Sequence, residues 1–100
     1  MRSWRVLLDQ LSVDDVFVVL DYADVFVVVR EGADGPSDTD WEVNVSTTGP
    51  LHLEPGRHEL HVKSADGHVL LGPAVLRFSD GRRHLFRGDG PLDGVDRLLQ

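Results

Sequence analysis

The amino-acid sequence predicts an all-β fold, either an antiparallel β-sandwich or a small, partly open barrel of about seven strands, with a short C-terminal helix. Two observations support this prediction. Val and Phe dominate the apolar runs of the first half of the chain, and these side chains favour extended backbone over helix. Gly, Pro and Asp recur at short intervals in the second half, as turns between consecutive strands require.

Length and composition indicate a single domain, residues 1–100. A chain of 100 residues, 41% hydrophobic and 27% charged, is typical of one globular domain. The chain contains no cysteine, which excludes disulfides and thiolate metal sites. Its apolar runs are shorter than a signal peptide or a membrane helix requires. We therefore expect a cytoplasmic protein with no membrane partner.

The N-terminal half contains three apolar runs. The first, Arg5–Leu8, is expected to open the sheet. The next two, Val16–Leu20 and Val25–Val29, are continuous rather than alternating, which is typical of strands covered on both faces. Turn-forming residues at 21–24 lie between these two runs and predict a β-hairpin, with a helix over residues 11–20 as the alternative.

A loop and a strand are predicted next. Residues 31–40 read EGADGPSDTD, and this concentration of Gly, Pro, Ser and Asp predicts a loop. The following segment, Trp41–Ser46, alternates between apolar and polar residues, which indicates a strand with one buried face. Trp41, Val43 and Val45 would then point inward.

The clearest local pattern is Pro55-Gly56 between two alternating runs. Pro fixes φ at the second position of a turn and Gly takes positive φ at the third, as a type II turn requires. If Leu53 faces His58 across this turn, the leucines of both runs share one face. The segment 51–62 resembles hairpins of bacterial β-sandwich modules such as the PEGA type, and no function is transferred from that likeness.

The remaining turn residues complete the predicted sheet. Asp66-Gly67 and residues 79–82 predict hairpin turns. Pro73 lies between them and indicates a bulge, a bend or an edge, because Pro cannot donate to a β-ladder. Apolar residues at helical spacing predict a short helix over residues 92–99. The predicted inner face comprises Val18, Leu20, Val27, Val43, Val45, Leu53, Leu60, Val62, Leu76 and Leu85.

The charge of the chain argues against a nucleic-acid partner. The formal net charge is −7, whereas nucleic-acid affinity depends on neutralising phosphates. The charge is uneven, because residues 1–50 carry three basic and ten acidic residues and residues 51–100 carry seven of each. The acidic half is suited to a basic partner, or it simply keeps the protein soluble.

The histidines suggest one candidate metal site. In the predicted hairpin, His52, Glu59 and His61 project from the face opposite the leucines. Two imidazoles and a carboxylate can ligate a divalent metal. The alternative is a solvated polar face, because strand alternation places polar residues there and no HExxH motif is present.

A second candidate site lies around one predicted hairpin, where four arginines occur. Guanidinium groups bind planar oxyanions through paired hydrogen bonds, which suggests an anion-binding or partner-binding site. The alternative is pairing with carboxylates of the protein itself. The four residues are Arg77, Arg82, Arg83 and Arg87.

The sequence shows no recognisable arrangement of catalytic residues. The serines lie in or beside predicted turns, and none is part of a Gly-x-Ser-x-Gly elbow. No glycine-rich segment matches a phosphate-binding loop. We therefore expect no enzyme activity, no catalytic residue and no cofactor.

These observations favour a non-enzymatic protein-interaction or accessory domain of a bacterial cytoplasmic protein, able to self-associate. The Val-rich N-terminal segment has more apolar surface than one small core needs. An apolar strand that is not covered within the monomer is typical of a protein-binding surface. Two alternatives stay open. One is a β domain that binds a small ligand or a divalent metal, and the other is an acidic inhibitor or immunity-type protein.

Overall fold

The computed structural model describes residues 2–30 and 38–95. Every secondary-structure element defined in these ranges is a β-strand, which confirms the predicted all-β class. Seven strands follow one another along the chain: β1 (Arg2–Val13), β2 (Val16–Phe17), β3 (Leu20–Arg30), β4 (Asp38–Thr47), β5 (Gly56–Ser64), β6 (Val69–Ser79) and β7 (Arg83–Gly88).

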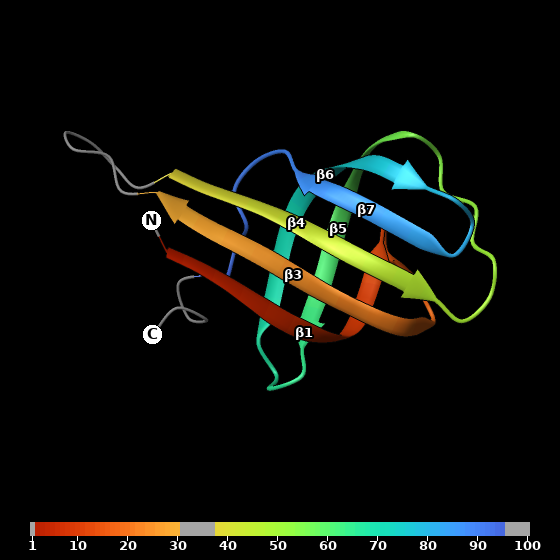
Figure 1. Ribbon diagram of the computed structural model, residues 1–100, viewed down its shortest axis with the longest axis horizontal. Coiled ribbons are helices and arrows are strands. Elements are labelled where there is room, and N and C mark those ends of the chain that lie inside the picture. The colour runs from red at the N-terminus through yellow and green to blue at the C-terminus, as the bar shows by residue number, and fades with distance from the viewer. Residues whose placement is uncertain (1, 31–37, 96–100) are drawn as a thin grey trace.

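Six of the strands close into an antiparallel barrel. They are neighbours in the order β1-β3-β4-β7-β6-β5, and β5 pairs back with β1. β2 is an additional strand paired with β1. In Figure 1, β1, β3, β4 and β7 form a front layer, with β5 and β6 behind it. The predicted sandwich or partly open barrel is thus realised as a closed barrel of six strands.

The first reversal of the chain lies at Asp14-Asp15, so the hairpin turn predicted at residues 21–24 is wrong. Both aspartates have positive φ, 50° and 68°, as in a two-residue type I′ hairpin turn. Val13 therefore pairs with Val16, while residues 21–24 belong to β3. The two Val-rich runs follow each other along one partner strand instead of pairing together. The type I′ turn was missed because it contains no glycine.

Residues 48–55, the crossing segment, pass over one end of the barrel from β4 to β5, so the predicted hairpin at Pro55-Gly56 is also wrong. Gly56 has the expected positive φ, 109°, but it begins β5. The backbone N–H of Leu51 donates to the Gly81 carbonyl at 2.7 Å and not to β5. The physical reason is that β1 and β6 occupy both edges of β5, which leaves no edge for the leucine segment.

The later predicted elements are confirmed. Asp66-Gly67 turns between β5 and β6, with Gly67 at φ 96°, and residues 79–82 connect β6 to β7. Pro73 pairs with Glu59 on the β5 side. On the other side, the pairing with β7 extends only as far as Ala74, so Pro73 interrupts no ladder there.

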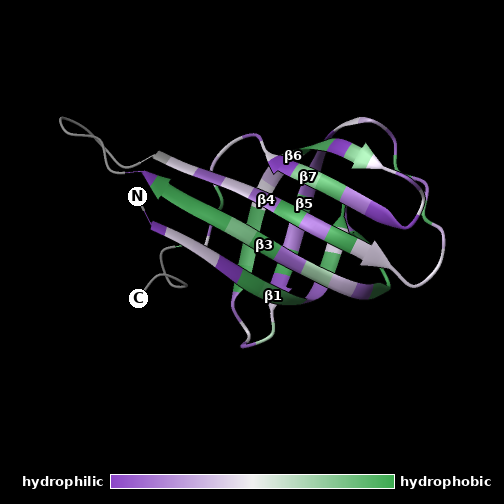
Figure 2. Ribbon diagram, viewed as in Figure 1, coloured by the Kyte–Doolittle hydropathy of each residue, from purple (hydrophilic) through white to green (hydrophobic). Residues whose placement is uncertain are grey.

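The barrel interior follows the alternation of the strands, visible along β5 in Figure 2. Five predicted inner-face residues are buried: Val27, Val43, Val45, Leu60 and Val62. Four are partly buried against the core: Val18, Leu20, Leu53 and Leu76. The prediction for Leu85 is wrong, because β7 is in the opposite phase and Phe86, 0% exposed, fills the core instead.

Trp41 packs inside the barrel, away from the crossing segment. Its ring lies so close to two glycines that an added Cβ would come within 2.3 Å of it at Gly88 and 2.8 Å at Gly72. The indole Nε1 donates to the Gly90 carbonyl at 2.9 Å. This arrangement ties the chain that follows β7 to the barrel.

The C-terminal segment that follows pairs with β6 at Asp93 and then turns at Gly94, which has a positive φ of 94°. Leu71 of β6 and Asp93 exchange two backbone hydrogen bonds of 3.0 and 2.7 Å. Residues 92 and 93 are therefore not helical, because this backbone pairing holds them against the free edge of β6. The predicted helix over residues 92–99 is unsupported, and its last four residues lie outside the described ranges.

Candidate functional site

Exposed apolar side chains gather where the crossing segment passes over the barrel. Val16, Phe17 and Val19 are 66%, 77% and 74% exposed. Pro50 and Leu51 of the crossing segment line the same hollow, of about 390 Å³, as Phe17 and Val19. We call these five residues the apolar end.

The pairing with β1 is irregular next to these residues. Ser12 pairs with Phe17, whereas Leu7 pairs with Asp24. Four residues of β1, 8–11, therefore lie opposite six residues of the facing chain, 18–23, which leaves two extra residues between these pairs. The Val18 N–H still reaches the Leu11 carbonyl at 3.0 Å, but the chain bends at this point. The sequence alone predicted this run to be covered on both faces, and that interpretation is wrong.

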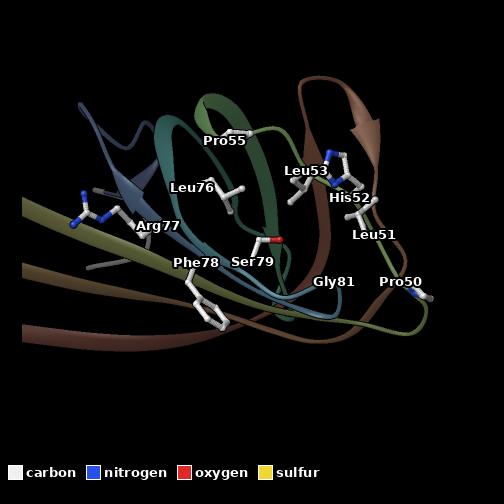
Figure 3. Close-up of a pocket in the computed structure, with 10 residues that line it drawn as sticks. All are labelled: Pro50, Leu51, His52, Leu53, Pro55, Leu76, Arg77, Phe78, Ser79 and Gly81. Atoms are coloured by element: carbon white, nitrogen blue, oxygen red, sulfur yellow. The ribbon is translucent and has the colours of Figure 1, made fainter.

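A second hollow, of about 450 Å³, lies on the other side of the crossing segment. Figure 3 shows Leu51, Leu53 and Leu76 around it, while Arg77 and Phe78 extend away from these leucines. The crossing segment thus separates two hollows with apolar walls. Leu51 lines both of them.

A histidine–aspartate pair connects the two segments that carry the apolar end. His58, 8% exposed, places Nδ1 2.6 Å from Asp14 Oδ2 and Nε2 2.6 Å from the Glu54 carbonyl. Burial opposes the charge on His58, but the hydrogen bonds to Asp14 and Glu54 outweigh it and raise its pKa. The Glu59 N–H and the His58 ring together lower the pKa of Asp14. The pair therefore favours an imidazolium facing a carboxylate.

The structure does not bring the predicted metal ligands together. His52 is on the crossing segment, with its side chain 85% exposed and Nε2 3.4 Å from Glu54 Oε1. Glu59 and His61 both point outward from β5. Across residues 2–30 and 38–95, no three His, Asp or Glu side chains are placed to hold one metal ion.

Ser64, Asp66 and His68 resemble a catalytic triad in composition but not in connectivity. The Ser64 hydroxyl donates to Asp66 and accepts the backbone N–H of His68 at 2.9 Å. The His68 ring contacts Asp66 at 2.9 Å and not the serine. Since Ser64 is 0% exposed, this group shapes the β5–β6 turn.

The four predicted arginines are distributed over different parts of the surface. Arg77 borders the hollow of Figure 3, and Arg82 lies in the β6–β7 turn. Arg83 lines a hollow on the outer face of the front layer, and Arg87 lines another beside the Arg30–Asp40 ion pair. They do not form one anion site.

Comparisons of this chain with protein-family models, curated proteins and solved structures find no match. In the part of the chain that the structure describes, no helix has the length and apolar character needed to span a membrane. The function is therefore inferred from the surface of this structure. The apolar end is its most exposed apolar feature.

Proposed function

We propose that this chain is a non-enzymatic protein-interaction domain whose apolar end docks against a second copy of the chain. The observation that carries the proposal is the exposure of Val16, Phe17 and Val19, each at least 66%. Covering apolar surface stabilises a complex by roughly 25 cal/mol per Å² before the costs of association. Exposed apolar patches bordered by polar residues are typical of protein-binding sites.

The charges around the apolar end favour a second copy as the partner. Exposed Asp15 precedes β2 and exposed Asp21 lies at the start of β3, whereas the β6–β7 hairpin carries exposed Arg77 and Arg82 with one exposed acid, Asp80. The crossing segment separates these groups, because it hydrogen-bonds to Val19 on one side and to the β6–β7 turn on the other. A two-fold arrangement would oppose the acidic flank of one copy to the basic flank of the next.

The free edge of β2 supports the same proposal. Within the described residues β2 pairs with β1 alone. Its outer edge therefore presents backbone groups beside the most exposed apolar side chains of the chain. Two such edges can meet across a two-fold axis, and the short length of β2 limits extension into larger aggregates.

Sedimentation velocity over a range of protein concentrations tests the proposal. The wild-type chain should show a concentration-dependent dimer, and Phe17→Ser should shift the equilibrium towards monomer by about tenfold or more. Val69→Ser is the matched control, because Val69 is 57% exposed but lies next to the β5–β6 turn. The control should dimerise like the wild type.

Two results would overturn the proposal. One is a wild-type chain that stays monomeric at the highest concentration reached. The other is equal dimerisation of Phe17→Ser and Val69→Ser, which would place the contact elsewhere. Added salt should weaken the dimer modestly, because the flanking charges are exposed and screened.

A further inference from the structure

A separate hollow of about 570 Å³ lies on the outer face of the front layer. It forms because short side chains stand between long ones. Strand register places Ser46 between Tyr22 and Arg83, and Asn44 lies next to Asp24 in the adjacent row. The serine and asparagine make a low floor, and the tyrosine and arginine rise on either side of it.

The floor of this hollow is held by a buried carboxylate. Asp24 points outward from the barrel yet is only 4% exposed. It accepts hydrogen bonds from the Tyr22 hydroxyl at 2.6 Å and from Asn44 Nδ2 at 3.0 Å. The bond to Asp24 raises the pKa of Tyr22, so the phenol stays protonated. Arg5 Nε, 3.8 Å away, supplies the opposite charge, and these contacts fix the floor before any ligand arrives.

The rim combines cationic and aromatic groups. Arg5, with a side chain 64% exposed, and Arg83 contribute guanidinium groups. Phe78 and Tyr22 are 53% and 46% exposed. A β-bulge between Leu76 and Phe78 sets Phe78 opposite Leu85 on this outer face. The hollow thus offers both ion pairing and ring contact.

The local charge selects the kind of anion. Two guanidinium groups against one carboxylate leave the lining with a net charge of +1, in a protein of formal charge −7. Asp80 is outside the lining, where its carboxylate accepts the backbone N–H groups of Arg82 and Arg83. A monoanion neutralises the hollow, whereas a dianion would leave excess negative charge next to Asp24.

We propose that this hollow binds a small aromatic monocarboxylate, with its carboxylate between Arg5 and Arg83 and its ring against Phe78. Arginine pairs with planar carboxylates through two parallel hydrogen bonds. An aromatic ring adds apolar contact with the exposed Phe78 face. This site is independent of the apolar end and does not require dimerisation.

Titration of the 15N-labelled protein with benzoate, followed by NMR, tests the proposal. Benzoate should shift the backbone amides of Asn44, Ser46 and Leu85 saturably. Benzamide, a neutral analogue of the same shape, should produce no saturable shift. Inorganic phosphate should bind at least about tenfold more weakly than benzoate.

Arg83→Gln should weaken benzoate binding by about tenfold or more. Arg82→Gln is the matched control, because it removes a neighbouring arginine that does not line the hollow. It should bind benzoate like the wild type. Equal binding by the two variants, equal shifts with benzamide, equal affinity for phosphate, or no saturable shift with benzoate would each overturn the proposal.

Discussion

His58 Nδ1 lies 2.6 Å from Asp14 Oδ2, although the two residues are separated by 44 positions in the chain. The contact joins β5 to the turn between β1 and β2, while the other ring nitrogen holds the Glu54 carbonyl on the crossing segment. One buried side chain therefore ties together both segments that frame the apolar end. The pair positions the surface that we propose for binding without being part of it.

Replacing His58 with Ala should destabilise the fold by about 1–2 kcal/mol, because Asp14 and the Glu54 carbonyl lose a charged hydrogen-bond donor. The low end of the range for charged bonds applies, since the Asp14 side chain is 52% exposed. Urea unfolding measures the change. His52→Ala is the control and should leave stability unchanged, because the His52 side chain is 85% exposed. Equal losses for the two variants would contradict this account.

The stability of the protein should pass through a maximum near pH 6.5, because two buried histidines titrate in opposite senses. Burial lowers the pKa of His84 from its usual 6.5, and its Nε2 has no hydrogen-bond partner among the described residues. Between the lowered pKa and 6.5 the unfolded chain binds a proton that the folded chain does not, so stability rises with pH. His58, whose pKa is raised, has the opposite effect above 6.5, where stability falls as pH rises.

Urea unfolding midpoints measured from pH 5 to pH 8 test whether stability rises with pH below 6.5 and falls above it. His58→Asn should flatten the fall above pH 6.5, and His84→Asn should flatten the rise below it. The lowered pKa values of Asp14, Asp66 and Asp80 act below their usual 3.8, outside this window. A profile unchanged by either substitution would contradict the assignment.

The sequence correctly predicted the elements that are determined by residues adjacent in the chain. The Asp66-Gly67 turn and the inward residues of Trp41–Ser46 were correct, because the turn residues and the alternation that define them are adjacent in the chain. The Pro55-Gly56 hairpin failed although its local pattern was stronger. Its pairing was decided by β1, which takes one edge of β5 from far away in the sequence.

The candidate sites were less predictable, because their parts come together only in the closed barrel. Arg83 was singled out from the sequence, but the arginine that shares its hollow is Arg5, near the other end of the chain. The continuous run of Val16–Val19 was recognised as apolar. Its exposure was not predictable, because no residue type signals the irregular pairing with β1 around it.

Gly88→Ala should cost about 2 kcal/mol, because a Cβ there would lie 2.3 Å from Trp41 Nε1 inside a packed barrel. The same change should alter the fluorescence of Trp41, whose ring is only 3% exposed. Gly49→Ala is the control, since no atom in the described part of the chain lies within 4 Å of an added Cβ at that position. Its stability should stay within about 0.5 kcal/mol of the wild type. A tolerated Gly88→Ala would mean that Trp41 can move aside.

Replacing each of the two aspartates of the β1–β2 turn with glycine should change the stability of the protein in opposite directions. Asp15 has φ 68° and its side chain is exposed, so Asp15→Gly removes a left-handed strain at no loss of contacts. We expect a gain of about 0.5–1 kcal/mol. Asp14, at φ 50°, would gain the same relief but lose its bonds to His58 and to the Glu59 N–H.

Asp14→Gly should therefore destabilise the protein by about 1 kcal/mol, the relief offsetting part of the lost hydrogen bonding. Thermal unfolding of both variants at pH 6.5 measures the difference in sign. At pH 8, where His58 carries less charge, the loss from Asp14→Gly should shrink while the gain from Asp15→Gly stays the same. If the two variants changed stability by the same amount at both pH values, backbone strain alone would determine the stability of this turn. The His58–Asp14 contact would then contribute nothing measurable to the free energy of unfolding.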